Sequence, residues 1–564
     1  MARIGAMLLL GMLLFAVDSD FKSHPQYIVA ALVAALAFVP FVSRHLSPSL
    51  DLHRSPSPRL NWIMAAVLFV LSARYFLLSA SLAGRDLFPK FHDEHMYLLQ
   101  ARMLAHGRLW MPRHPLGEFF ESFNVIVKPV YAATYFPGTA LFYVPGIWLN
   151  AAPWSTSVLI AGLAVAMLYL VMTEMLDGVA GLLAALLAMS LQQLRGISVM
   201  TMSHPVMLLL FLLTLWGYLR WRRNHSIGWA ALMGITAGWA AITRPLDALC
   251  LIAPLGVAMF WEARKLPTRC HLILMGIVVL GALPFLSLQL AFNKGTTGSF
   301  LHTPFGEYAK ANFPGLNFGW SAKTPAAESP SPLPQVRDYY QQFLRDDFAK
   351  HGREGFLHTW IGRRLEPAAD AALPGHLLFI LLPIGLLGLG KTMRWAVAAG
   401  ALLLPLAYTF YPSYLKHYGL VTAPAFILLS LLGIRVLCQK LPSLGLALPI
   451  AMAAMAIGSL PEFHGTDDPY MHAPYLADIN AKLAQLDHTP AVVLFHYDSG
   501  KTDVHEEPVY NLDTPWPDDA PIIRAQDLGP ENHKIFSYYA RLQPRRFFYR
   551  YDRTTAELTP LGWR

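Results

Sequence analysis

Charged residues and cysteines are both scarce in this sequence. Of its 564 residues, 14% are charged and three are cysteines, Cys250, Cys270 and Cys438. All three cysteines stand in apolar runs or at their ends, so the long polar segments offer no disulfide framework. The sequence also has no Cys-x-x-Cys pair, no Walker loop and no strand-flanked Gly-x-Gly-x-x-Gly. It therefore provides no motif for a bound nucleotide.

The residues that are abundant are apolar. Hydrophobic residues make up 55% of the chain and the mean hydropathy is +0.39, values typical of a polytopic membrane protein. The formal net charge of +8 comes from basic residues that lie next to apolar runs, without a basic soluble patch. The charge therefore reports membrane topology, and nucleic acid is excluded as a partner.

The apolar runs predict a polytopic α-helical membrane protein with about thirteen transmembrane helices. The predicted spans are 4–17, 27–43, 60–82, 155–175, 178–194, 205–219, 227–243, 246–261, 271–291, 375–390, 395–411, 419–437 and 441–460. Several of these runs are shorter than the roughly 20 residues that a bilayer core requires.

Basic residues set the expected orientation, because they accumulate in cytoplasmic loops. One predicted inner turn is an exception, since it carries Glu174 and Asp177 and no positive charge. We expect an inner-membrane (plasma-membrane) protein whose large polar segments face the periplasm or exterior. The loops that alternate as the rule requires contain Arg44, Arg54 and Arg59, then Arg220, Arg222 and Arg223, then Arg264, Lys265 and Arg269, then Lys391 and Arg394.

Three regions follow from this topology: an N-terminal membrane hairpin at 1–59, a multi-span catalytic domain at 60–461 and a small external domain at 462–564. External loops are expected at 83–138 and 292–374, with amphipathic helices in them. In the second loop a Pro-rich stretch precedes a helix predicted at 336–351, and Arg363 and Arg364 are expected to anchor the next span at the membrane interface.

The last hundred residues lose the long apolar runs and predict an α/β fold. Leu476, Ile479, Leu483 and Leu486 form one helical stripe, and residues 491–495 and 546–551 have strand-like patterns. This region shows no catalytic constellation. Structural capping is favoured for it over acceptor docking.

The first external loop concentrates the chemistry. Asp93 and Glu94 open a segment of helical periodicity that Gly107 is placed to end. Asp93 has two interpretations: it caps the helix N-terminus, or it is a catalytic carboxylate. Capping alone does not account for the four histidines, the further acids and the exit Tyr135-Phe-Pro-Gly138 in the same loop. The histidines are His92, His95, His106 and His114.

The order of an apolar span, Asp-Glu, a short helix and Tyr-Phe-Pro-Gly resembles the GT-C class of membrane glycosyltransferases, especially the aminoarabinose-transferase and protein O-mannosyltransferase type. The resemblance implies a polyprenyl-phosphate-linked sugar donor and an active-site acid in the first external loop. Asp93 is then the catalytic candidate, with Glu94 as its companion. Where these families often have a second acid, this sequence has His204, which is a catalytic candidate or a helix cap.

Basic residues at external ends of later spans are candidates for binding the donor phosphate. Arg244 either grips phosphate oxygens or extends to the lipid headgroups. Lys416 and His417 either contact phosphate or acceptor, or pair with nearby acids. His95, Tyr97 and Tyr135 are assigned to the acceptor side or to loop structure.

The combined prediction is an inverting transferase, active outside the cytoplasm, that passes a sugar to a lipid, glycan or protein acceptor. Asp93 serves as general base, and Arg244 with Lys416 holds the departing phosphate. No cofactor is firmly expected, although a divalent ion held by Glu94 and a nearby histidine is chemically sensible. The alternative is a transporter of a lipid-linked or anionic substrate, which would place its charges near the membrane midplane.

Overall fold

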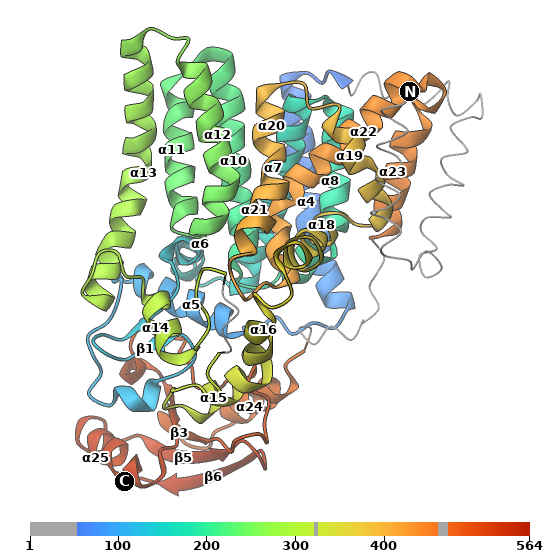
Figure 1. Ribbon diagram of the computed structural model, residues 1–564. Coiled ribbons are helices and arrows are strands. Elements are labelled where there is room, and N and C mark those ends of the chain that lie inside the picture. The colour runs from blue at the N-terminus through green and yellow to red at the C-terminus, as the bar shows by residue number, and fades with distance from the viewer. Residues whose placement is uncertain (1–53, 321–324, 461–471, 564) are drawn as a thin grey trace.

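The computed structural model describes residues 54–320, 325–460 and 472–563. Long helices run side by side in a bundle, and a smaller part with a β-sheet lies against one end of it (Figure 1). The predicted spans at 4–17 and 27–43, and with them most of the expected hairpin 1–59, lie outside the described residues.

Six helices in the described part of the chain are long and apolar enough to cross a membrane. A pair of helices, Phe356–Ala372 and His376–Leu386, raises this number to seven if it is one span; the chain bends by 110° between them. A multi-pass membrane protein is therefore confirmed, but the count of thirteen is not. The six helices are α4 (Pro58–Leu82), α7 (Pro153–Met175), α10 (Ser203–Asn224), α12 (Pro245–Ala263), α13 (Thr268–Thr297) and the segment Lys416–Lys440, which comprises η7 (Lys416–Thr422) and α22 (Ala423–Lys440).

Other predicted spans form shorter helices that complete the bundle. They are too short to cross a bilayer core unaided. The run at 375–390 begins at the sharp bend between Ala372 and His376. These shorter helices are α8 (Gly178–Ser190), α9 (Gln192–Ile197), α11 (Ile227–Ala241), η6 (His376–Ile380), α19 (Leu381–Leu386), α20 (Thr392–Ala398), α21 (Gly400–Tyr408), η8 (Pro442–Leu444) and α23 (Ala447–Gly458).

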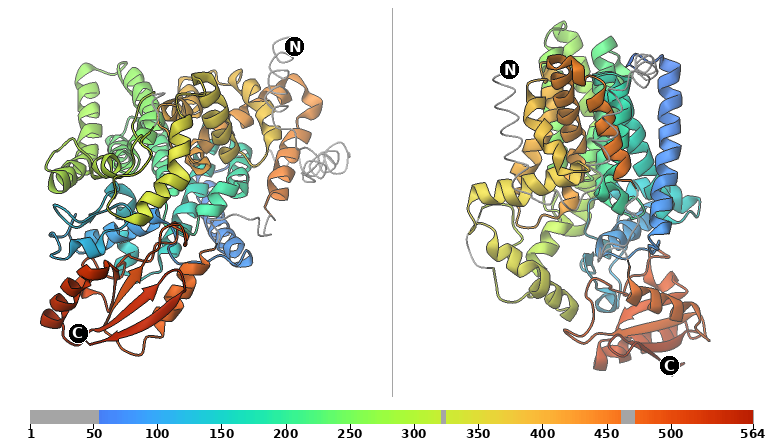
Figure 2. Two further views of the ribbon diagram at one scale, coloured as in Figure 1. Left: turned by 60° about the horizontal axis from the view of Figure 1, so that its bottom comes forward. Right: turned by 90° about the vertical axis from the view of Figure 1, so that its right-hand side faces the viewer.

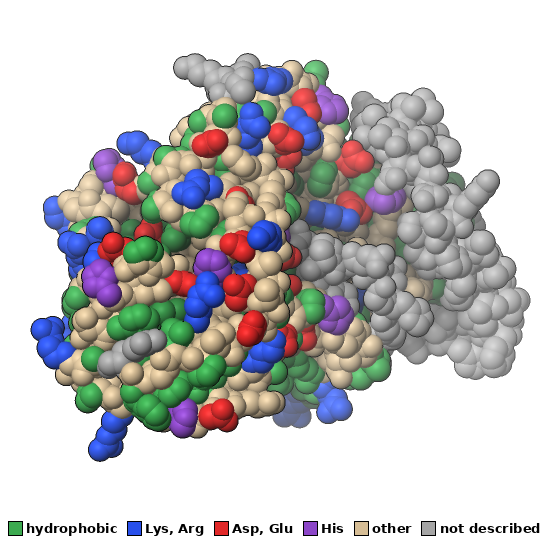
Figure 3. All heavy atoms as spheres, turned by 90° about the horizontal axis from the view of Figure 1, so that it is seen from below, with side chains coloured by type: hydrophobic (Ala, Val, Ile, Leu, Met, Phe, Trp, Pro, Cys, Tyr) green, Lys and Arg blue, Asp and Glu red, His purple; other side chains and the backbone are tan. Residues whose placement is uncertain are grey.

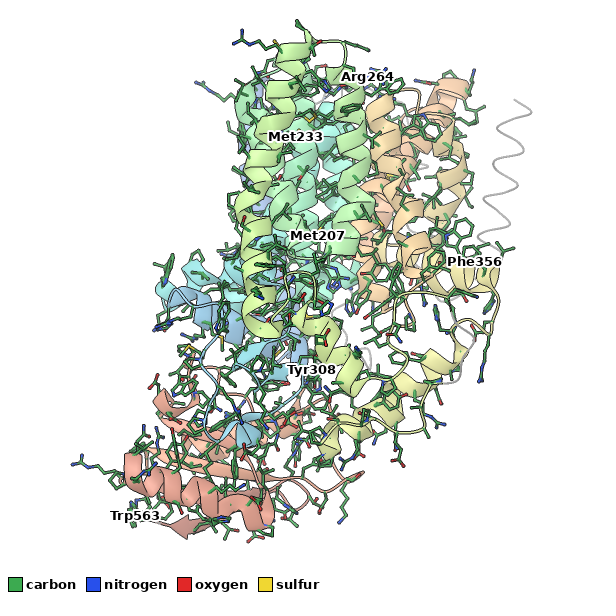
Figure 4. The ribbon with its side chains drawn as sticks, turned by 60° about the vertical axis from the view of Figure 1, so that its left-hand side comes forward. Met207, Met233, Arg264, Tyr308, Phe356 and Trp563 are labelled. Atoms are coloured by element: carbon green, nitrogen blue, oxygen red, sulfur yellow. The ribbon has the colours of Figure 1, made fainter. Side chains whose placement is uncertain are left out.

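One end of the bundle is rich in ion pairs. Glu174 forms ion pairs with Arg220 and Arg223, each at 3.0 Å, and Asp177 forms one with Arg435 at 3.2 Å. The two acids that broke the charge rule in the sequence are thus neutralised by arginines from neighbouring helices. Figure 4 places Arg264 at this end and Met207 toward the other end, which faces the C-terminal sheet.

The polar segments gather at the end opposite the arginines. They include a short hairpin in which β1 pairs with β2 in antiparallel fashion. Residues 304–312, expected as loop, form a helix because Thr303 caps it and Pro304 begins it. The elements here are α5 (His92–Ala105), η3 (Gly117–Phe120), β1 (Val125–Ile126), β2 (Ala132–Ala133), α6 (Pro137–Trp148), α14 (Pro304–Asn312), α15 (Pro334–Tyr339), η4 (Tyr340–Leu344), α16 (Arg345–Lys350), α17 (Phe356–Trp360), η5 (Ile361–Leu365) and α18 (Glu366–Ala372).

Arg364, expected as an anchor of the next span, is held within the protein. Its guanidinium is buried and donates to the carbonyl oxygens of Tyr408 and Tyr411, both at 2.9 Å, while it lies 5.2 Å from the ring centre of Tyr414. Carbonyl groups at and just beyond the C-terminal end of α21, where the helix dipole is negative, favour this cation.

The C-terminal residues form a four-stranded sheet of order β4-β3-β5-β6, in which only the β5–β6 pair is antiparallel. The strands predicted at 491–495 and 546–551 coincide with β3 and β5. The elements are α24 (Pro474–Ala484), β3 (Ala491–His496), η9 (Pro517–Asp519), β4 (Ile522–Gln526), η10 (Gly529–Glu531), α25 (Asn532–Leu542), β5 (Phe547–Asp552) and β6 (Glu557–Gly562).

Alternate residues of β3 face two different cores. Val493 packs with α24 on one side, whereas Val492 and Leu494 share a core with Met96 of α5 and Val336 of α15. The sheet is thus packed onto the external loops. It lies below the bundle in both views of Figure 2, and basic and acidic side chains are interspersed on its outward face (Figure 3).

Candidate active site

Helix α5 begins one residue before the Asp-Glu pair, and the two acids make different hydrogen bonds. The N-cap is Phe91, and the Glu94 carboxylate accepts the backbone N–H groups of Lys90 at 3.0 Å and Phe91 at 3.4 Å. Asp93 is not the N-cap, so that interpretation is wrong. Gly107 follows the end of α5 in the left-handed conformation, as its position in the sequence predicted.

Glu94 also reaches beyond its own helix. Its second oxygen accepts the backbone N–H of Thr201 at 2.9 Å, and the side chain is buried. Both carboxylate oxygens are therefore occupied by backbone donors. Glu94 fixes the start of α5 to the segment that leads into α10.

Asp93 points elsewhere and is partly exposed. One of its oxygens accepts the hydroxyl of Tyr135 at 2.6 Å, and the ring of Tyr135 lies 5.2 Å from that of Tyr97. Burial raises the pKa of the Asp93 carboxyl, while the Tyr135 hydrogen bond and the charge of Arg244 offset part of that rise. Burial and the charge of Asp93 hold the pKa of Tyr135 well above its usual value, so its hydroxyl remains a donor.

The Tyr-Phe-Pro-Gly exit brings Tyr135 to this position. Pro137 begins α6, and Gly138 donates its N–H to the carbonyl of Ile242 at 2.8 Å. A Cβ atom on Gly138 would lie 2.6 Å from that same carbonyl oxygen, closer than side chains tolerate. Glycine is therefore needed for the close approach of α6 to the end of α11, directly beside Arg244.

Arg244 is the N-cap residue of α12 and is held by three partners. It forms an ion pair with Asp247, and it donates to the hydroxyl groups of Ser203 at 3.2 Å and Tyr408 at 2.8 Å. Its guanidinium also lies 4.7 Å from the ring centre of Tyr418. Arg244 thus points into the protein and does not extend to lipid headgroups. A guanidinium has five N–H groups, so three hydrogen bonds leave two for a ligand.

Two histidines stand next to this arginine. The rings of His204 and His417 lie 4.6 Å apart, and His204 stacks on Tyr418 at 5.2 Å. Both nitrogens of His204 and the Nε2 atom of His417 are buried without a hydrogen-bond partner among the described residues. His204 therefore caps no helix.

Two other candidates lie outside the cluster. Lys416 forms an ion pair with Asp370, which also accepts His376 at 2.9 Å, so the acid-pairing alternative is the one observed. His95 lies on the other face of α5 and stacks on Tyr510 at 4.3 Å. The site cluster therefore consists of Asp93, Tyr97, Tyr135, His204, Arg244 and His417.

The donor set for a divalent ion does not fit the expectation. Both oxygens of Glu94 are already bonded to backbone N–H groups, on the side of the residue that holds the start of α5 in place. Over residues 54–320, 325–460 and 472–563, no three His, Cys, Asp or Glu side chains come together as metal ligands.

Sequence reasoning missed Tyr408, which joins the two halves of the Arg244 network. Its hydroxyl donates to Asp247 at 2.8 Å and accepts from Arg244. The available signal was the recurrence of tyrosine at 408, 411, 414 and 418 beside a proline at the end of a predicted span. Such a run is unusual for a lipid-facing helix end, although tyrosine is also common at membrane interfaces.

No family model and no curated protein matches this sequence. Similar solved structures include apo ArnT from Cupriavidus metallidurans, at 13% identity and a TM-score of 0.49, over 88% of this chain and 93% of that one. The same protein bound to undecaprenyl phosphate gives 15% identity and a TM-score of 0.42, over 85% and 88%. Arabinofuranosyltransferase AftD from Mycobacteria gives 16% identity and 0.37, over 88% and 35%.

These proteins are GT-C glycosyltransferases, the class that the sequence resembles.

Proposed function

We propose that this protein is a membrane glycosyltransferase that moves a sugar from a polyprenyl-phosphate-linked donor to a hydroxyl group of a lipid, glycan or protein. The observation that carries the proposal is the Asp93 carboxylate. It is partly exposed, is free of capping bonds and has a raised pKa, and it stands within electrostatic reach of Arg244. A base and a phosphate-binding cation are the two groups that this transfer needs.

The chemistry can be assigned to named groups. Asp93 takes the proton of the acceptor hydroxyl as the oxygen forms a bond to the anomeric carbon. The bond from that carbon to the phosphate oxygen breaks, and its electron pair stays on the phosphate. A phosphate ester leaves as an anion and needs no proton, so one carboxylate is sufficient. Attack opposite the leaving group inverts the anomeric centre.

Arg244 and the histidines form the phosphate side of the site. Asp247, Ser203 and Tyr408 hold the guanidinium in place before the donor arrives. The unpartnered nitrogens of His204 and His417 add hydrogen-bonding positions beside it. Preorganised donors of this kind stabilise charge that develops on a leaving group. Glu94 acts as a positioning residue, because it fixes the helix that presents Asp93.

The site's place in the bundle fits a lipid-linked donor. It is built from the starts of α10, α12 and η7 and lies at the end opposite the arginine-rich end, which we assign to the cytoplasm. A donor whose polyprenyl chain stays in the bilayer can reach this level, and transfer would then occur on the external side.

A transfer assay with the purified full-length protein tests the proposal. A panel of undecaprenyl-phosphate sugars is offered with acceptor-containing membrane extract, and nucleotide sugars are offered in parallel without polyprenyl lipid. We expect turnover only with lipid-phosphate donors. Turnover with a nucleotide sugar in lipid-free detergent would overturn the proposed donor class.

A further inference from the structure

A cavity lies on the other face of α5, between the end of the bundle and the C-terminal sheet. Its volume is about 290 Å³. Helices α5 and α6 line it on one side, and α24, β4 and the 507–513 loop line it on the other. Residues that matter for its chemistry are His95, Arg102, Asn480, Asp513 and Arg524.

This cavity is separate from the Asp93 cluster. Asp93 and His95 are two residues apart, which places them about 200° apart around a helix of 3.6 residues per turn. None of the six cluster residues lines the cavity. A molecule bound here would therefore not occupy the proposed catalytic site.

The lining carries an excess of positive charge. Within the described residues, neither the Arg102 nor the Arg524 guanidinium forms an ion pair. Arg102 donates to the carbonyl of Leu512 at 3.1 Å, and Arg524 donates to the Asn480 side chain at 2.7 Å and the Pro508 carbonyl at 3.3 Å. Burial lowers the pKa of Arg524 to about 10, which still leaves it charged at neutral pH.

The carboxylates of the lining do not cancel this charge. Glu507 is fully buried and forms an ion pair with Arg553 at 2.8 Å. Asp513 is exposed at the rim. Two guanidinium charges therefore face one solvated carboxylate.

A third group points to a ligand. The His95 side chain is only 5% exposed, and its Nδ1 atom is buried without a hydrogen-bond partner. Burial and the charge of Arg524 lower the pKa of His95 to about 3, so the imidazole is neutral. A neutral imidazole has one N–H, which His95 donates to the Pro89 backbone carbonyl, so its unpartnered Nδ1 can accept a hydrogen bond from a hydroxyl group of a bound molecule.

The cavity opens beside an apolar part of the surface. Ile147 and Ala151 line it, and the residues between them include Trp148 and Leu149, which are 68% and 80% exposed. This turn joins α6 to the first residue of the membrane span α7. Exposed tryptophan at the end of a span is typical of the level of the lipid headgroups.

We propose that this cavity binds a phosphate-bearing headgroup at a site distinct from the Asp93 cluster. Arginine binds phosphate with two parallel hydrogen bonds, and each arginine here has N–H groups without a recorded partner. A membrane lipid and a soluble phosphate ester present the same chemistry. The occupant would contact α5, α6 and the C-terminal part together, and thus hold them in one arrangement.

The experiment measures binding alone, so it stands whether or not the proposed transferase activity is correct. Full-length protein in a neutral detergent is titrated with glycerol 1-phosphate in one arm. In a second arm it is titrated with mixed micelles of phosphatidylglycerol, with phosphatidylcholine micelles as the uncharged control. Saturable thermal stabilisation by phosphatidylglycerol alone identifies a lipid, and saturable stabilisation by glycerol 1-phosphate identifies a soluble ester.

We expect Arg102→Gln and Arg524→Gln each to weaken binding by on the order of tenfold, since one charged hydrogen-bond donor is lost. Arg541→Gln, which changes an exposed arginine on α25, should bind as the wild type does. If Arg524→Gln unfolds through loss of the Asn480 bond, Arg102→Gln carries the test. If neither phosphatidylglycerol nor glycerol 1-phosphate stabilises the protein, or if Arg102→Gln binds with unchanged affinity, the proposal is overturned.

Discussion

Glu94→Gln separates positioning from chemistry in the α5 loop. One carboxylate oxygen accepts the backbone N–H groups of Lys90 and Phe91, and the other accepts the backbone N–H of Thr201. Glutamine has one oxygen and one NH₂ group, so in either orientation its NH₂ faces a backbone N–H. At least one buried donor then loses its partner, which costs about 1–3 kcal/mol.

The loss falls on the link between α5 and the segment before α10. If the orphaned donor is Thr201, the start of α5 is released from the bundle and Asp93 shifts relative to Arg244. Because a misplacement of about 1 Å can cost on the order of 100-fold in rate, we expect both a lower unfolding free energy and a rate reduced by about 10- to 100-fold.

Thermal unfolding and single-turnover transfer measure the two effects in the same preparation. The matched control is Glu328→Gln, which makes the same chemical change at an exposed position in the second external loop and should alter neither quantity. A Glu94→Gln protein as stable and as active as the wild type would refute the positioning role.

Three other substitutions probe the site. Tyr135→Phe removes a hydrogen bond that lowers the pKa of Asp93; that pKa should rise further, and the acidic limb of the rate–pH profile, where Asp93 becomes protonated, should move to higher pH. An unmoved limb would contradict this. Gly138→Ala pushes a methyl group against the Ile242 carbonyl and should cost about 1–3 kcal/mol of stability, seen as a lower unfolding midpoint; an unchanged midpoint would disprove the tight contact. Arg244→Lys keeps the charge but loses the planar fork, so KM for the donor should rise more than kcat falls; an unchanged KM would argue against phosphate binding.

Short-range signals in the sequence predicted the local structure of the site well. Asp93 and Glu94 do stand at a helix start, and Gly107 follows the helix end. These features depend on residues within a few positions of one another, and their physical rules are local. The division of labour between the two acids was not predictable, because it depends on Thr201, which is more than a hundred residues away.

Membrane features were predicted with uneven success. The long spans were found because their apolar runs are continuous. The number of spans was not confirmed, because in a hydropathy pattern a short apolar helix, or an apolar run next to a 110° bend, resembles a full membrane span. Glu174 and Asp177 seemed to break the charge rule only because Arg220 and Arg435, which pair with them, come from other parts of the chain.

Charged residues near span ends were the hardest to assign. Arg244 and Arg364 were both candidates for the headgroup region, yet both are drawn inward by tertiary partners that the sequence does not reveal. Lys416 was expected at the phosphate and pairs with Asp370 instead. A basic residue at such a position interacts with whichever acid or carbonyl group the fold brings near, and pattern alone does not identify that group.

We propose Asp93 as the general base. The most direct test is the single-turnover transfer rate of Asp93→Asn, measured with donor binding and thermal unfolding on the same protein. Asparagine keeps the size of the side chain, and Asp93 makes no capping bond that would be lost. We expect a rate about 100- to 10,000-fold lower, with donor affinity and unfolding midpoint close to those of the wild type. Transfer at a near wild-type rate would contradict it.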